Sequence, residues 1–117
     1  MILANEHRIK SSKRIEQVKK EGKLLQSENF GTVVLKRDDK EPSQFAFVIS
    51  TKVSKLAVHR NRISRAFNEG VRRNLSITPM GWDVVILTKK SIASKSTEEI
   101  MREVERFIAD LKKTPPF

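Results

Sequence analysis

The chain contains no cysteine among its 117 residues, which excludes disulfide bridges and thiolate metal sites and agrees with a reducing compartment. No apolar run approaches the ~18 residues that a membrane-spanning helix requires. The apolar start of the sequence ends at Ala4, so we expect no signal peptide, no membrane contact and a cytoplasmic location. Repeats and low-complexity tracts are absent too, and the length fits a single domain, residues 1–117.

Acidic residues are scarce in one region of an otherwise highly charged chain. Twenty-four Lys and Arg residues face 14 Asp and Glu residues, a formal net charge of +10. Between Lys52 and Arg73, seven basic residues accompany a single acid, Glu69, and the centre of this stretch reads Arg60-Asn61-Arg62. Such a cluster repels itself and gains nothing from burial, so a bound polyanion explains it best. We therefore expect RNA or DNA binding that depends strongly on salt.

Apolar periodicity predicts one small α/β (α+β) domain with the order α-β-β-α-β-α. The expected elements are a short helix between a cap at Ser11 or Ser12 and Gly22, strands at Phe30–Lys36 and Gln44–Thr51, a helix from about Ala57 to Leu75, a strand at Trp82–Thr88, and a helix opened by the capping box Ser96–Glu99. A fourth short strand is expected near Leu24–Ser27. Residues 1–10 are expected to form a basic, flexible, irregular arm, and residues 114–117 a C-terminal tail.

The middle helix is predicted to divide its residues between a core and a ligand. At 100° per residue, Ile63, Phe67 and Val71 form an apolar stripe, and the opposite face is polar and basic. Guanidinium groups bind phosphate oxygens in a fork, and asparagine can bond a sugar or base edge. The predicted RNA-binding residues are Lys52, Lys55, Arg60, Asn61, Arg62, Arg65, Asn68 and Arg72. A merely solvated basic helix is the alternative. The last helix alternates acids and bases, which is typical of a solvated face.

The segment Ser50–Arg72 resembles the signature of the bacterial ribonuclease P protein subunit. It reads as a Ser-Thr-Lys-Val-Ser turn followed by a helix that opens with Arg60-Asn61-Arg62-Ile63. Upstream, Phe45–Ser50 is similar to the strand that precedes the turn in that family, and Gly81–Lys90 is similar to its later strand. The resemblance covers nearly the whole chain in the same order. One departure is Ser54, which stands where the family usually has glycine.

This resemblance implies a fold and a function. The fold would be a mixed four-stranded sheet packed with three helices, with a left-handed βαβ crossover, as in the ribosomal protein S5 domain 2-like fold. The protein would be the non-catalytic subunit of ribonuclease P, which binds the catalytic RNA and the 5′ leader of precursor tRNA and assists endonucleolytic 5′ maturation. Mg²⁺ would act through the RNA subunit, with none bound directly by the protein, and no protein oligomer would be required.

The resemblance also implies a cleft for the single-stranded 5′ leader, which the family often lines with aromatic residues. Here the matching positions are Ile15, Lys19 and Val33, so leader binding would depend more on charge. Phe45 and Phe47 share one face of a strand and are either core residues or a platform on which bases stack. The possible leader-cleft residues are therefore Ile15, Lys19, Val33, Phe45 and Phe47.

Two other function classes compete with this interpretation. A self-sufficient nuclease would need a carboxylate cluster for metal ions or paired histidines for acid–base chemistry. His7 lies in the expected arm and His59 beside the arginines, while Asp38, Asp39 and Glu41 share a polar turn that is more simply a solvent-exposed loop. No catalytic residue and no metal ligand is therefore predicted. The second competitor is a ribosomal or other structural RNA-binding protein.

Overall fold

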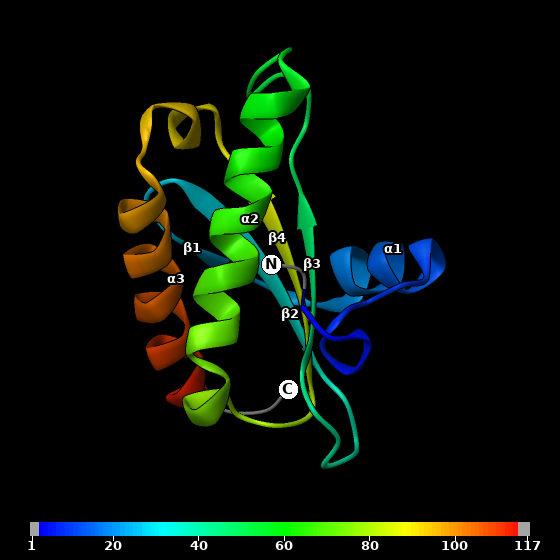
Figure 1. Ribbon diagram of the computed structural model, residues 1–117. Coiled ribbons are helices and arrows are strands. Elements are labelled where there is room, and N and C mark those ends of the chain that lie inside the picture. Colours follow the sequence, from blue (N-terminus) through cyan, green and yellow to red (C-terminus); the bar gives the residue numbers. More distant parts are fainter. Residues whose placement is uncertain (1–2, 115–117) are drawn as a thin grey trace.

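The computed structural model describes residues 3–114. A four-stranded sheet separates α2 and α3 on one face from α1 on the other (Figure 1). The helices are α1 (Ser12–Glu21), α2 (Ala57–Arg73) and α3 (Thr97–Lys112), and the strands are β1 (Lys23–Gln26), β2 (Phe30–Lys36), β3 (Gln44–Val48) and β4 (Trp82–Thr88). Short 3-10 turns lie at η1 (Asn5–His7), η2 (Leu75–Ile77) and η3 (Lys90–Ser94). No helix within residues 3–114 is long and apolar enough to cross a membrane.

The sheet is mixed and has the strand order β1-β2-β4-β3. β2 pairs antiparallel with both β1 and β4, whereas β3 pairs parallel with β4. The parallel neighbours β3 and β4 are joined through α2, which makes a βαβ unit. The predicted mixed sheet with three helices is thus confirmed, as is the short fourth strand near Leu24. The handedness of the crossover stays a prediction.

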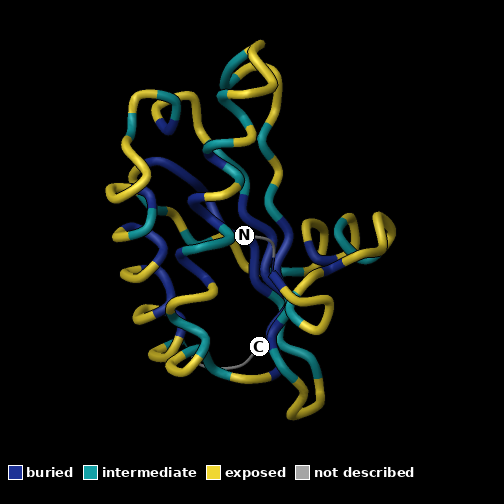
Figure 2. The backbone as a smooth tube through the Cα atoms, viewed as in Figure 1, coloured by how far each residue is buried: buried dark blue, intermediate teal, exposed yellow. Residues whose placement is uncertain are grey.

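Two hydrophobic clusters follow from the alternation of side chains along the strands. On one face, Phe30, Phe45 and Ile86 pack against the apolar sides of α2 and α3. On the other face, Val33 and Val85 pack with residues of α1 and of the preceding segment. Figure 2 shows the buried positions concentrated in the sheet and on the inner sides of α2 and α3. Among the described helices, α1 is therefore the only one on this face of the sheet, and the candidate site described below lies beside it.

The ends of the helices agree with the local sequence signals. Ser11 caps α1 by accepting a hydrogen bond from Arg14 N at 3.3 Å. Ser96 and Glu99 form the predicted capping box of α3, with both reciprocal hydrogen bonds at 3.2 Å. Within α2, a Cβ added at Gly70 would lie 3.2 Å from Val104 Cβ. This glycine allows α2 and α3 to approach closely, although it weakens the helix locally.

Residues 3–10 correct the expectation of an irregular arm. Leu3 and Ile9 are buried in the two hydrophobic clusters. Ile9 N donates to Phe45 O at 3.0 Å, and Arg8 forms an isolated parallel bridge with Phe45. The segment is packed because its apolar side chains cover the edge of the sheet at β3. Residues 1–2 and the tail residues 115–117 lie outside the described residues.

One acid of α3 also departs from the expected solvated face. The Glu103 side chain is buried and accepts hydrogen bonds from Asn29 N and Asn29 Nδ2, both at 2.8 Å, and from Ser27 Oγ. A buried carboxylate is stable when several donors satisfy it. Glu103 therefore fastens the β1–β2 turn to α3.

Candidate nucleic-acid interface

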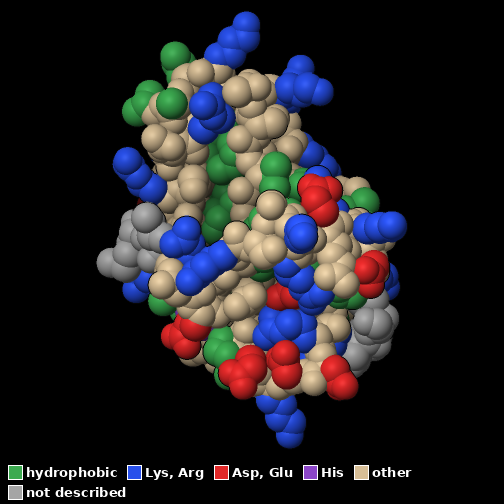
Figure 3. Space-filling view, turned by 90° about the vertical axis from the view of Figure 1, so that its right-hand side faces the viewer, with side chains coloured by type: hydrophobic (Ala, Val, Ile, Leu, Met, Phe, Trp, Pro, Cys, Tyr) green, Lys and Arg blue, Asp and Glu red, His purple; other side chains and the backbone are tan. Residues whose placement is uncertain are grey.

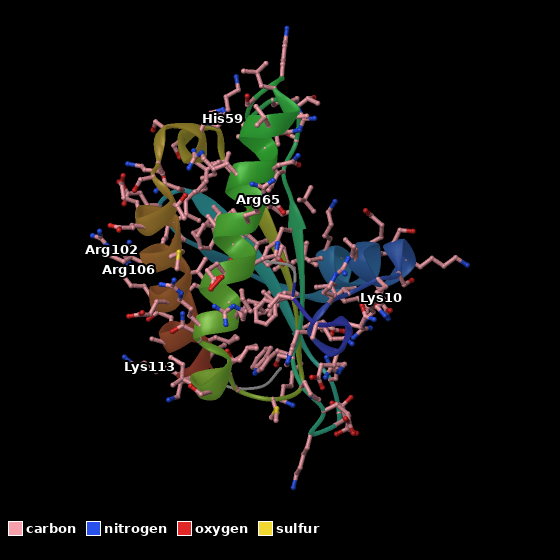
Figure 4. The ribbon with its side chains drawn as sticks, viewed as in Figure 1. Lys10, His59, Arg65, Arg102, Arg106 and Lys113 are labelled. Atoms are coloured by element: carbon pink, nitrogen blue, oxygen red, sulfur yellow. The ribbon has the colours of Figure 1, made fainter. Side chains whose placement is uncertain are left out.

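Helix α2 presents an outward face that is rich in arginine and asparagine. Its other side packs on the sheet, whereas Asn61, Arg65 and Arg72 are exposed. Arg65, midway along α2 in Figure 4, makes no hydrogen bond or ion pair with any other described residue. The first turn of α2 contains no acid, and its N-cap Leu56 provides no side-chain hydrogen bond. A polyanion could therefore contact Arg65 without displacing an internal partner.

Arg60 and Arg62 are partly engaged with the protein backbone. Arg60 Nη1 donates to Ser54 O at 2.8 Å. Arg62 Nη2 donates to Lys95 O at 3.1 Å and lies 3.3 Å from His59 Nε2. A guanidinium has five N–H donors, so each arginine keeps donors for a phosphate. The two side chains fasten the β3–α2 turn and the end of η3 to α2, a structural role that the sequence did not indicate. Their binding to RNA stays a prediction.

Glu69 neutralises the far end of the basic face. Its carboxylate accepts hydrogen bonds from Arg72 and lies 3.3 Å from Arg73 Nε. The Glu69–Arg73 pair has the i,i+4 spacing that brings two side chains together on a helix. The hydrogen bond from Arg72, together with the charges of both arginines, lowers the pKa of Glu69, and the same contact raises the pKa of Arg72. Arg72 is consequently a weaker candidate for phosphate binding than Arg65.

The turn before α2 exposes two lysines. Lys52 and Lys55 are both solvent-exposed. The turn is held by hydrogen bonds from Lys52 N to Ser50 Oγ at 3.3 Å and from Leu56 N to Ser54 Oγ at 3.2 Å. Ser54 therefore closes the turn with its hydroxyl group. Both lysines precede the first turn of α2 in the chain.

A cleft of about 310 Å³ opens between α1, β3 and α2. Viewed from the α1 side, the surface shows a hollow with a hydrophobic floor and Lys and Arg side chains around it (Figure 3). The structure brings together three of the five residues predicted for a leader cleft with others that were not predicted. The lining residues are Arg8, Ile9, Ile15, Phe45, Ala46, Phe47, Ser64 and Asn68.

The two phenylalanines of β3 differ in their environments. Phe45 is 2% exposed and belongs to the core. Phe47 is half-buried, and its ring stacks on that of Phe67 with centroids 5.5 Å apart and an interplanar angle of 19°. Phe47 thus packs on the core with one side and lines the cleft. Whether it also stacks on a base stays a prediction.

Three predicted site residues lie where the sequence did not place them. Asn68 was expected beside Arg65 on the outward face, but it lines the cleft and is held by Nδ2 donating to Ser64 O at 2.8 Å. Val33 is buried beneath α1. Lys19 lies 3.5 Å from Glu16 on the exposed side of α1. Neither Val33 nor Lys19 lines the cleft, which α1 reaches through Ile15.

The cleft continues into a basic extension that the sequence did not indicate. A second hollow of about 300 Å³ shares Arg8 and Ile9 with the cleft and is also lined by Lys10 and Arg14. Figure 4 shows Lys10 on the α1 side of the molecule. These residues precede or begin α1. The sequence signal that could have found them is the alternation in Arg8-Ile9-Lys10, in which one buried residue separates two exposed cations.

Two acids close to the polar turn, Asp83 and Asp39, are paired with arginines. Asp83 Oδ2 accepts from Arg14 Nε and its Oδ1 accepts from Arg37 Nη1, both at 2.6 Å. Arg37 Nε also donates to Asp39 Oδ2 at 3.0 Å, and this hydrogen bond lowers the pKa of Asp39. Burial lowers the pKa of Arg37, but its bonds to the two aspartates outweigh that effect and raise it. Within residues 3–114, no group of three or more His, Asp or Glu side chains could hold a metal ion.

Comparisons with known proteins agree on one family. The family model for ribonuclease P matches residues 3–112. The ribonuclease P protein component of Rippkaea orientalis is 32% identical over 110 residues, which cover 91% of this chain and 87% of that protein. The protein component of Thermotoga maritima is 34% identical over 76 residues, 65% of this chain and 63% of its own length.

Solved structures show the same fold. The ribonuclease P protein of Staphylococcus aureus superposes with a TM-score of 0.81 at 20% identity, covering 92% of this chain and 95% of that one. The protein from Thermotoga maritima gives a TM-score of 0.79 at 24% identity, covering 89% and 96%. The alternative of a ribosomal or structural RNA-binding protein receives no support from these matches. The chain belongs to the ribonuclease P protein family.

Proposed function

We propose that this chain is a non-catalytic subunit that holds two RNAs, the ribonuclease P RNA on α2 and the 5′ leader of precursor tRNA in the cleft. The RNA subunit would cleave the tRNA precursor at its mature 5′ end, and Mg²⁺ would be bound by that RNA. The observation that carries the proposal is the exposed basic face of α2, with Arg65 unpaired among the described residues, in a chain of this family. Two acidic residues, Asp39 and Asp83, pair with arginines.

The catalytic RNA would lie along the outward face of α2 and its preceding turn. Lys52, Lys55 and Arg65 are exposed there, and Asn61 could reach a sugar or base edge. Arg60 and Arg62 would add the donors that their backbone hydrogen bonds leave unused. The phosphate contacts would release counterions, so the affinity should fall steeply as salt rises.

The leader would cross the cleft between α1, β3 and α2. Its phosphates would lie near Arg8 and Lys10, and its bases would meet Ile15 and the exposed side of Phe47. Aromatic stacking stabilises a bound base by roughly 1–3 kcal/mol, which an aliphatic side chain at position 15 does not supply. Leader binding should therefore depend on the basic extension more than on stacking.

Reconstitution with the cognate ribonuclease P RNA tests the proposed function. Cleavage of a precursor tRNA would be measured at low magnesium concentration, with and without the protein. We expect cleavage at the mature 5′ end to be faster with the protein, and the protein alone to leave the substrate intact. Cleavage by the protein alone, or an RNA activity that the protein leaves unchanged at every magnesium concentration, would contradict the proposal.

Leader binding is tested by the double substitution Arg8→Ala and Lys10→Ala. Both side chains are exposed and make no hydrogen bond or ion pair with other described residues, so the fold should persist. We expect the reconstituted enzyme to lose most of its preference for precursor tRNA over mature tRNA, measured as the ratio of their dissociation constants. The matched control, Lys112→Ala with Lys113→Ala, removes the same charge from the end of α3 and should preserve that ratio.

A further inference from the structure

Two large apolar side chains are exposed at the start of α2, between the exposed lysines of the preceding turn and the basic outward face of the helix. Leu56 is 65% exposed and Val58 is 75% exposed, the two highest values among the large exposed hydrophobic residues of the described chain. Neither packs on either core cluster. In Figure 1 this end of α2 projects beyond the sheet, and Figure 3 shows hydrophobic side chains beside Lys and Arg at the same end.

Val58 also lies in register with the outward face of α2. At 100° per residue, positions i, i+3 and i+7 share one side of a helix, so Val58 lies in a row with Asn61 and Arg65. The apolar core stripe around Phe67 is on the opposite side. Val58 therefore faces whatever molecule Arg65 contacts.

The charge around these side chains selects the occupant. No Asp or Glu occurs between Glu41 and Glu69, whereas exposed Lys52 and Lys55 precede Leu56 in the same loop. A segment that contributes exposed cations and no acid favours a polyanion over a typical protein surface. Folded RNA also offers apolar surface, because its unpaired bases can be unstacked and covered by side chains.

We propose that Leu56 and Val58 form an apolar anchor that packs against an unpaired nucleobase or ribose of the ribonuclease P RNA. This inference rests on the proposed function, because it assigns an additional contact to the same RNA interface. The proposal predicts a specific dependence of affinity on salt concentration. Contacts to phosphates release counterions and set the slope of affinity against salt, whereas apolar burial adds affinity that does not involve ions.

The test compares two double variants. The anchor variant carries both Leu56→Asn and Val58→Thr, and the lysine variant carries both Lys52→Ala and Lys55→Ala. Asparagine and threonine keep nearly the shape of the original side chains, and asparagine is favoured at a helix N-cap, so α2 should form normally. Binding to the cognate ribonuclease P RNA, transcribed in vitro, is measured by filter binding over a series of salt concentrations. The matched control is Ile77→Thr with Met80→Gln, two exposed hydrophobic residues beyond the other end of α2.

We expect the anchor variant to bind about tenfold or more weakly at every salt concentration, with an unchanged slope. The lysine variant should show a shallower slope, and the control should match the parent protein. An anchor variant that binds like the parent, or that changes only the slope, would overturn the anchor. So would sedimentation showing that the parent self-associates through these residues at the assay concentration. If Arg65→Ala weakens binding while the anchor variant does not, the proposed function stands and the anchor falls. If the parent does not bind this RNA, both fall.

Discussion

At the scale of single residues, Glu69 opposes the function proposed for α2. It is the only acid in that helix, and it holds Arg72 and Arg73 in ion pairs. We expect Glu69→Gln to release both guanidinium groups and to increase affinity for the ribonuclease P RNA about two- to fivefold at low salt, since exposed pairs of this kind are weak. Filter binding measures the change. Glu105→Gln removes an exposed acid of α3 that has no ion pair among the described residues, and it should have a smaller effect.

The same pair makes stability depend on pH in a defined direction. The hydrogen bond from Arg72 lowers the pKa of Glu69 in the folded protein. A carboxyl group with a lowered pKa stabilises the fold above its unfolded-state pKa, and this contribution disappears as pH falls through the folded-state pKa. The parent should therefore be more stable than Glu69→Gln at neutral pH, and the difference should vanish well below the usual glutamate range. Urea unfolding at neutral pH and in acid measures the difference in stability between the two proteins. A difference of the same size in acid would contradict the pairing.

Side-chain roles were predictable only where they depend on helical spacing. The Glu69–Arg73 pair and the buried stripe through Phe67 follow from positions on one helix. The bonds of Arg60 and Arg62 do not, because their carbonyl acceptors lie in a turn and in a segment 33 residues away from Arg62. The burial of Glu103 does not follow from helical spacing either, since its donors come from the β1–β2 turn, which is distant in sequence.

At the scale of elements, Asp83 joins α1 and the end of β2 to β4. Its carboxylate is 1% exposed and accepts hydrogen bonds from Arg14 and Arg37, both at 2.6 Å. Asp83→Asn would remove the negative charge and leave both guanidinium groups poorly matched. Because hydrogen bonds to charged groups contribute about 1.5–3 kcal/mol, we expect the free energy of unfolding to decrease by about that amount. Urea denaturation measures it.

A control distinguishes this ion-pair network from a general effect of charge. Asp38→Asn makes the same chemical change at an exposed position with no bond to another described residue. It should change stability by less than ~0.5 kcal/mol. Equal effects of the two substitutions would show that Asp83 does not fasten α1 to the sheet.

The elements themselves were largely predictable, and their limits were less so. Alternation identified β2 and β4, and the capping box marked the start of α3. The helix α2 ends at Arg73 rather than near Leu75, because Asn74 leaves the helical conformation and Nδ2 of its side chain donates to Gly70 O at 2.7 Å. Residues 3–10 pack on the sheet because the edge strand β3 offers a backbone partner, which local periodicity does not reveal.

At the scale of the whole molecule, the cleft depends on strand order. Chain neighbours β2 and β3 are separated by β4 in the sheet, which puts β3 at an edge between α1 and α2. Residues 8–15, 45–47 and 64–68 meet there. No spacing in the sequence relates these three segments, so the cleft residues could be suggested only by resemblance, and two of the five suggestions, Lys19 and Val33, lie outside it.

RNA binding could depend on the basic outward face of α2 or on the total net charge of +10. Figure 4 shows Arg102 and Arg106 on α3, apart from Arg65 on α2. Arg65 and Arg106 are both exposed helical arginines without an ion pair among the described residues. We expect Arg65→Ala to weaken binding to the ribonuclease P RNA and to reduce the slope of log affinity against log salt by about 0.7–0.9, the value of one phosphate contact.

Arg106→Ala, which removes the same charge from the same kind of residue, should leave that slope unchanged because long-range effects between exposed charges are screened beyond about 10 Å. Salt titrations of the two variants side by side provide the measurement. If both slopes decreased equally, the RNA would be attracted by the net charge of the protein rather than seated on α2. Binding of the RNA on α2 would fix the orientation of the protein on the RNA subunit. It would thereby also fix the direction in which the cleft faces the leader.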